Sequence, residues 1–233
     1  MVEVLIVLLL MHVAIALHEL GHYVVYRKYR VPVLGVYLGG PPWVLRWKRK
    51  GTDYLLGLIP LFGAVLVRED DAKHLTPPDW VRVYLAGPLA SLLAALAGFV
   101  LWGVLKGSLL YTLKAVVAVL GFPVFLVGDL FRALFGDLST AGAIPMFQVT
   151  GSVIRQGGLE GLALVWGALN AVLFWFNLLP IPPLDGGQAV YRLFAGRKWV
   201  EKAYPYALGF GLAILFALTE IAILKDVARL LGR

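Results

Sequence analysis

The residues with the clearest chemistry are His18, Glu19 and His22, within the segment His18-Glu19-Leu20-Gly21-His22. They match the pattern H-E-x-x-H, in which two histidines bind zinc and the glutamate acts on a zinc-bound water. Residues i and i+4 share one face of a helix, so both imidazoles can reach one metal ion. Two other interpretations leave the segment without a metal: a chance match to the pattern, and a buried polar cluster.

The motif lies in an apolar setting. The residues from Val2 to Leu17 are nearly all apolar, and the whole chain is 60% hydrophobic and only 15% charged. Because soluble domains average about 45–50% apolar residues, this composition predicts an integral membrane protein. An ionisable side chain at such a depth is costly to place there, which favours a functional role for His18, Glu19 and His22.

The cysteine count and the net charge narrow the possible ligands and partners. The chain of 233 residues contains no cysteine, so a zinc site must use histidine and carboxylate ligands. Its net charge is +7. We attribute this charge to basic residues that flank membrane spans, and we expect no nucleic-acid partner. The first segment lacks a basic start and has Glu3 instead, so we expect a retained span and not a cleaved signal peptide.

Hydrophobic runs predict an α-helical polytopic membrane protein with one membrane-embedded domain over residues 1–233. The predicted spans cover about residues 2–26, 82–105, 160–181 and 204–224. Small residues recur at helical spacing in the second span, where Gly87, Ser91 and Ala95 form one ridge that permits close helix packing.

The two stretches between the first three spans carry helix-breaking signals. Repeated proline and glycine with short β-prone runs predict β-hairpins over 31–68. This sheet either dips into the membrane beside the first helix or forms an interfacial amphipathic loop. Residues 107–159 are expected to be an interfacial segment, in which 136–158 is rich in loops. Within it, 109–130 is predicted to form an interfacial or re-entrant helix, because its apolar run is too short to cross.

Asp185 is the candidate third ligand. It follows the third span and a proline-rich turn, and two glycines come directly after it. The alternative is that Asp185 only caps the helix that follows. His12 lies 600° around the helix from His18, so we expect it to pack or to support the site and not to bind the metal.

Asp185 can meet His18 and His22 only if the chain crosses the membrane once between the first and the third of the predicted spans. This holds if 82–105 crosses and 109–130 does not. With four spans, 14 of the 21 Lys and Arg residues lie on the side that follows the first span, and the other 7 lie opposite. The positive-inside rule then places the zinc end nearer the cytoplasm and both termini outside.

The pair of motifs resembles the site-2 protease family of intramembrane zinc metalloproteases, in a minimal form without a PDZ domain. The resemblance rests on His18–His22 and on Asn177-Leu178-Leu179-Pro180 through Leu184-Asp185-Gly186, and it covers most of the chain. It implies one zinc ion per chain, bound by His18, His22 and Asp185, with Glu19 as general base and acid. Asn177 is expected to help hold the substrate backbone.

Two further features bear on this resemblance. The segment Gly57–Gly63 looks like the family's membrane-embedded β segment, which makes Gly57, Ile59, Pro60 and Gly63 candidate substrate-binding residues. Many bacterial members carry a PDZ domain between the second and third core helices, and residues 107–159 are too few to hold one.

The resemblance implies hydrolysis of peptide bonds within or near transmembrane segments. The expected substrates are single-span membrane proteins, such as membrane-anchored regulators, in the lipid bilayer of a prokaryotic cell membrane. A substrate helix must unwind locally, and pairing with an edge strand from 53–67 would replace its lost hydrogen bonds. The alternatives are a zinc-binding transporter and a non-catalytic membrane scaffold.

Overall fold

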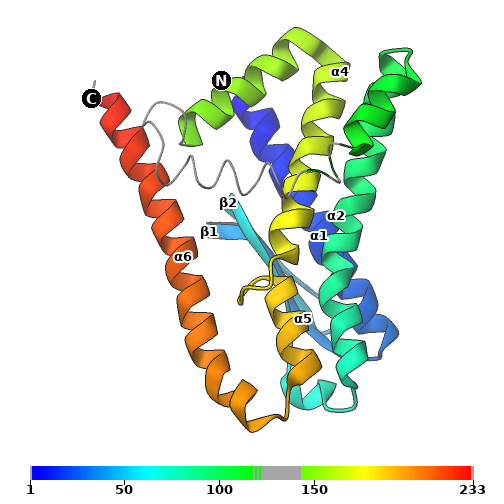
Figure 1. The fold of residues 1–233 in the computed structure, drawn as a ribbon, viewed down its shortest axis with the longest axis vertical. Coiled ribbons are helices and arrows are strands. Elements are labelled where there is room, and N and C mark those ends of the chain that lie inside the picture. Colours follow the sequence, from blue (N-terminus) through cyan, green and yellow to red (C-terminus); the bar gives the residue numbers. More distant parts are fainter. Residues whose placement is uncertain (1, 118, 120, 122–142, 232–233) are drawn as a thin grey trace.

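The computed structural model describes residues 2–117, 119, 121 and 143–231. Helices dominate these residues, and a two-stranded antiparallel sheet follows the first helix (Figure 1). In chain order the elements are α1 (Val2–Lys28), β1 (Val33–Arg49), β2 (Thr52–Val67), the 3-10 helix η1 (Glu69–Ala72), α2 (Pro77–Leu105), α4 (Ala143–Leu178), α5 (Asp185–Phe194) and α6 (Lys198–Leu230).

Four helices of the described chain are long and apolar enough to cross a membrane, as the sequence predicts. The spans are Val2–Lys28, Pro77–Leu105, Met146–Leu178 and Lys198–Arg229. Each begins before or ends beyond its predicted bounds, except that the third ends at Leu178 and not at residue 181. This earlier end agrees with the presence of Pro180, because proline disfavours helical backbone in the residue before it. Both termini lie at the same end of the molecule (Figure 1).

The third span corrects part of the prediction for residues 107–159. Residues 143–157 were expected to be loop-rich, but they form the first part of α4. Gly158 takes a non-helical conformation with φ 54° and ψ −126°, so the chain kinks there between two helical stretches of α4 (Figure 1). Residues 109–117 are helical. Most of the rest of the predicted interfacial or re-entrant helix, 122–130, lies outside the described residues.

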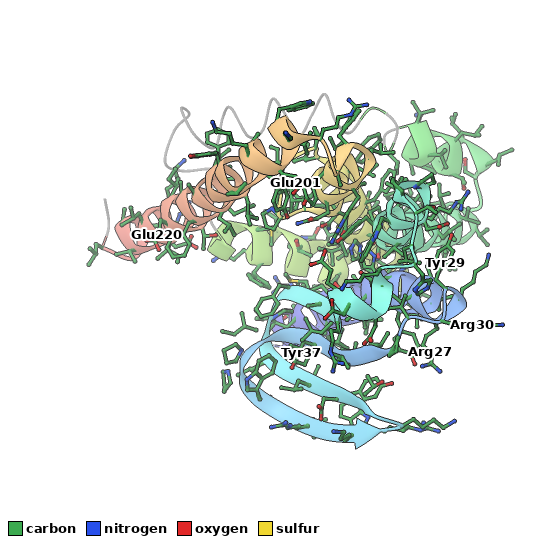
Figure 2. All side chains as sticks on the ribbon, turned by 90° about the horizontal axis from the view of Figure 1, so that it is seen from below. Arg27, Tyr29, Arg30, Tyr37, Glu201 and Glu220 are labelled. Atoms are coloured by element: carbon green, nitrogen blue, oxygen red, sulfur yellow. The ribbon has the colours of Figure 1, made fainter. Side chains whose placement is uncertain are left out.

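The β region predicted over 31–68 is present as one long hairpin. Arg49 pairs with Thr52, and the two residues between them, Lys50 and Gly51, have φ angles of 49° and 85°. Positive φ at both central residues is the requirement of a type I′ turn, which suits the twist of antiparallel strands. The hairpin extends away from the helices on the side of α1, as the view along the helices shows (Figure 2).

Both strands bend, so that different parts of β2 lie at different places in the sheet. Residues 53–56 pair on both sides, for example Tyr54 with Val36 and with Trp47. Residues 63–67 pair only with the first part of β1 within the described chain. The predicted edge strand over 53–67 is therefore an edge only in its last part.

Helix α2 holds the molecule together between α1 and α4. Its residues Gly87, Ser91 and Ala95 are buried, as expected for a packing ridge. On its α4 side, a methyl group added at Gly98 would lie 2.7 Å from the Gly167 nitrogen, so the two helices approach at their glycines. A cluster that includes Tyr26, Trp80 and Val83 then packs the start of α2 against the end of α1.

Candidate metal centre

Three side chains from α1 and α5 converge on one point. The Nε2 atom of His18 lies 3.0 Å from Asp185 Oδ2, and the Nε2 atom of His22 lies 3.3 Å from the same oxygen. The two Nε2 atoms are themselves 3.3 Å apart. All three residues are screened from the surroundings, with His18 and His22 buried. The structure therefore brings together the three residues that the sequence offers as zinc ligands.

The other ring nitrogen of each histidine has its own partner in α2. His22 Nδ1 donates to the Val83 carbonyl oxygen at 2.8 Å, and His18 Nδ1 lies 2.9 Å from the Ser91 hydroxyl. A neutral His22 that donates through Nδ1 presents a lone pair at Nε2. Partners of this kind orient the ligand histidines of metal sites and raise their basicity.

A metal ion fits the donor set that results. Lone pairs and a carboxylate oxygen that face each other at 3.0–3.3 Å repel unless a cation or a proton lies among them. Two imidazole nitrogens and one carboxylate oxygen match the ligands of catalytic zinc sites, which keep a fourth position open. Histidine, unlike carbonyl and water oxygen, also favours zinc over magnesium or calcium.

Gly87 provides the space in which such an ion would lie. A methyl group added at Gly87 would be 2.2 Å from His22 Nε2 and 2.7 Å from His18 Nε2. The absence of a side chain at residue 87 therefore leaves the region between the two imidazoles clear.

Asp185 reaches the histidines because α5 starts directly after the turn that ends α4 (Figure 1). The N-cap residue of α5 is Leu184, and no side chain caps this helix. The carboxylate of Asp185 is directed at the histidines, so the alternative role of a helix cap is wrong. Gly186 permits the tight turn, since a methyl group there would lie 2.3 Å from the Leu178 carbonyl oxygen.

Arg192, two turns further along α5, connects this helix to α2 and to η1. Its guanidinium lies 4.2 Å from the centre of the Trp80 ring of α2, and its Nη2 atom lies 2.9 Å from Glu69 Oε1. The stack on Trp80 fixes the distance between α5 and α2, and thus between Asp185 and the helix that orients both histidines.

Glu19 lies on the side of α1 that faces the sheet. It is buried, and within the described residues no group donates a hydrogen bond to its carboxylate. Strand β2 passes next to it: a methyl group added at Gly63 would lie 2.6 Å from both Cγ and Oε1 of Glu19. A carboxylate without a protein donor is free to accept a proton from another molecule.

The other predicted substrate-binding residues lie at different places. Of the β2 residues, Gly63 is beside Glu19, while Gly57 and Ile59 pair with Trp43 and Gly40 of β1. Pro60 lies between these points and is buried. At the end of α4, the Asn177 amide donates to the Leu173 carbonyl of its own helix at 2.9 Å. Their role with substrate stays a prediction.

Sequence reasoning missed three contributors to the site: the Ser91 hydroxyl, the Val83 carbonyl and the space at Gly87. Gly87 and Ser91 were recognised only as small packing residues. A polar serine on a packing ridge of a membrane helix, one turn from a glycine, is a signal that could have indicated a hydrogen bond to a ligand histidine. No feature of the sequence marks the Val83 carbonyl, because every residue has a backbone carbonyl.

The fold and these side chains define the class of protein: a membrane protein in which two histidines of one helix and a carboxylate of a later helix form a group that could hold a metal ion. The model of peptidase family M50 matches residues 6–218. The chain therefore belongs to this family of metalloproteases, the site-2 protease family.

Curated relatives agree with this membership. A Campylobacter jejuni protein is 33% identical over 94 residues, which are 39% of this chain and 25% of the relative. A Neisseria meningitidis protein is 40% identical over 80 residues, which are 33% of this chain and 17% of the relative. Both carry the name "putative zinc metalloprotease". The chain thus matches a quarter or less of the length of either relative.

Proposed function

We propose that this protein is an intramembrane zinc metalloprotease that hydrolyses peptide bonds within or near the transmembrane segments of other membrane proteins. One observation carries the proposal. The Nε2 atoms of His18 and His22 and the Oδ2 atom of Asp185 lie within 4.8 Å of one another in helices of membrane length, next to the buried carboxylate of Glu19. A hydrolytic site this deep suits a substrate that is itself embedded in the membrane.

His18, His22 and Asp185 would hold one zinc ion between α1 and α5. When bound there, zinc supplies a Lewis acid that polarises the scissile carbonyl and makes water a stronger nucleophile. Ser91 and Val83 hold the imidazoles in place, so that binding requires little rearrangement of these side chains.

Glu19 is the group that moves protons in this proposal. Its carboxylate accepts a proton from the attacking water and then donates it to the amine nitrogen that leaves. Burial of Glu19 and the absence of a protein donor to its oxygens in the described chain keep the carboxylate available for this role. Gly63 keeps strand β2 close to Glu19 without blocking it.

The substrate in this proposal is an extended stretch of a single-span membrane protein. Its own helix must open first, because helical carbonyls are engaged in hydrogen bonds. Residues 63–67 pair on one side only within the described chain and pass beside Glu19, so a substrate strand can add to their other side. Asn177, Gly57, Ile59 and Pro60 are the remaining candidates for holding this strand.

The proposed orientation places the metal end of α1 nearer the cytoplasm of a prokaryotic cell. Arg27 and Arg30 lie at that end of α1 (Figure 2), and the basic residues of the hairpin turn follow them. The four candidate spans of the described chain, with both termini at the opposite end, agree with this orientation (Figure 1).

Zinc transport is the other function that such a chain could have. A transport path needs ligand groups at several depths. In the described chain, His18, His22 and Asp185 form the group of three ligands that could hold a metal, and it lies at one level. This favours hydrolysis.

The experiment compares the wild-type protein with Glu19→Gln during co-expression with candidate single-span proteins. Glu220→Gln is the matched control, because it is the same substitution at an exposed position on α6 (Figure 2). We expect a cleaved product with the wild type and with Glu220→Gln, and none with Glu19→Gln, while all three retain zinc. Equal cleavage by Glu19→Gln and the wild type would reject the proposal.

A further inference from the structure

His12, the first histidine of the chain, contacts the sheet and not the metal centre. Helical spacing places His12, Ile15 and Glu19 on one face of α1, because they are three and four residues apart. This face lies against strand β2. A methyl group added at Gly63 of β2 would meet both Ile15 and Glu19, at 2.7 Å and 2.6 Å.

His12 forms a hydrogen bond to this strand. Its Nε2 atom lies 2.9 Å from the Gly57 carbonyl oxygen, and its Nδ1 atom lies 2.9 Å from the Leu8 carbonyl oxygen of its own helix. Carbonyl oxygens only accept, and a neutral imidazole carries one N–H, so the bond to Gly57 requires the tautomer with the proton on Nε2, in which Nδ1 does not donate to Leu8. Inside the membrane, water does not compete for such a bond.

The backbone around this bond is packed so closely that only glycine fits. A methyl group added at Gly39 would lie 3.2 Å from His12 Nε2 and 2.9 Å from the Gly57 carbonyl oxygen. A methyl group added at Gly57 would lie 2.0 Å from the Gly40 carbonyl oxygen. The imidazole of His12 therefore contacts the place where the two bent strands meet.

Strand β2 is thus attached to α1 at two points, Gly57 and Gly63. Six residues of strand can extend about 20 Å, whereas the seven residues of helix from His12 to Glu19 rise only about 10 Å. The strand between the two points has more length than it needs. It bends between them, with Leu58, Ile59 and Phe62 exposed and Pro60 buried.

We propose that His12 is a positioning residue for strand β2. Its bond to the Gly57 carbonyl fixes where the bent segment 57–63 begins, and so holds the edge residues 63–67 at one register beside Glu19. The part of this inference that concerns cleavage rests on the proposed proteolytic function. The part that concerns the position of the strand does not.

The test uses spin labels, since the chain contains no cysteine that would need removal. Val13→Cys on α1 and Leu58→Cys on β2 provide labelling sites, because both native side chains are exposed, at 42% and 59%. Pulsed electron spin resonance then gives the distribution of distances between the labels. It is measured in this background and with His12→Leu, which removes the donor, or His12→Gln, which keeps one.

His74→Leu is the matched control. His74 also bonds a backbone carbonyl through Nε2, at 2.9 Å from Tyr29, but it lies in the exposed loop before α2. We expect one narrow distance distribution for the background and for the control. We expect a broader or displaced distribution for His12→Leu, and a return towards the narrow one for His12→Gln. An unchanged distribution in His12→Leu overturns the proposal.

Cleavage and zinc content complete the test in the protein without labels. Displacement of a reacting group by about 1 Å can cost on the order of 100-fold in rate. We therefore expect His12→Leu to lower kcat at least tenfold, with full zinc content and partial rescue by His12→Gln. A displaced strand with unchanged kcat overturns the role of His12 in cleavage. Cleavage by Glu19→Gln would instead refute the proposed function, and the label distances would still decide the role of His12.

Discussion

Replacement of Gly87 by alanine is expected to abolish zinc binding with little effect on the rest of the fold. The added methyl group would lie 2.2 Å from His22 Nε2 and 2.7 Å from His18 Nε2, in the region between the two imidazoles. It would compete directly with the metal for this space.

The size of the effect follows from these distances. An ordinary contact starts at 3.4 Å, so His22 must retreat by about 1.2 Å to accommodate the methyl group. Metal sites tolerate deviations of only about 0.2 Å in ligand distance. We therefore expect the zinc dissociation constant to rise at least ~100-fold, which corresponds to about 2.7 kcal/mol.

Two other glycine substitutions serve as controls. Gly98→Ala, on the same helix, would place its methyl group 2.7 Å from the Gly167 nitrogen, far along α2 from the histidines. It should cost about 1–3 kcal/mol of stability through overpacking while zinc is retained. Gly209→Ala has no atom within 4 Å of its methyl group and should change neither property.

The assay measures zinc per chain by mass spectrometry after purification in detergent, over a series of chelator concentrations. Thermal unfolding of the same samples reports stability. If Gly87→Ala holds one zinc ion per chain with wild-type affinity, the metal does not lie between His18 and His22 as we infer.

Three further outcomes are expected. Ser91→Ala should weaken zinc binding by about 10–100-fold, since it removes the partner of His18 Nδ1. Ser152→Ala is the control, because the Ser152 hydroxyl bonds a carbonyl of its own helix. Equal zinc affinity in the two variants would contradict the role of Ser91. Gly63→Ala should keep its full zinc content but cleave at least ~10-fold more slowly, because the added methyl group would meet Glu19. Normal cleavage by this variant would show that β2 is not held against Glu19. Arg192→Lys should lower the free energy of unfolding by about 1 kcal/mol, as the stack on Trp80 is lost, and an unchanged thermal unfolding curve would argue against that contact.

The sequence was sufficient to predict the spans and to bring Asp185 to the histidines. Long apolar runs identify membrane helices reliably because the bilayer accepts little else. The position of Asp185 follows from counting crossings, since the second span takes the chain away from the side of His22 and the third span brings it back. Two local signals, H-E-x-x-H and the carboxylate after the third span, then indicate one metal site.

Other features depend on tertiary contacts that carry no local signal. The Gly157-Gly158 pair does not show that another helix precedes it, and the structure has a helical stretch of α4 on each side of the kink at Gly158. Which part of β2 lies at the sheet edge depends on how β1 folds back. The sequence alone therefore does not show that 53–56 is paired on both sides whereas 63–67 lies at the edge. The contact of His12 with Gly57 joins residues 45 positions apart, and helical spacing shows only that His12 is not a ligand.

The most direct measurement uses purified protein in lipid vesicles with a single-span substrate. The protein is first stripped of metal and then reloaded with one equivalent of zinc, and the product masses locate the bond that is cut. The proposed function predicts cleavage only after zinc is restored, at a bond within or next to the membrane segment of the substrate, and none by Glu19→Gln. Cleavage by the metal-free protein, or cleavage confined to bonds far from the membrane, would contradict it.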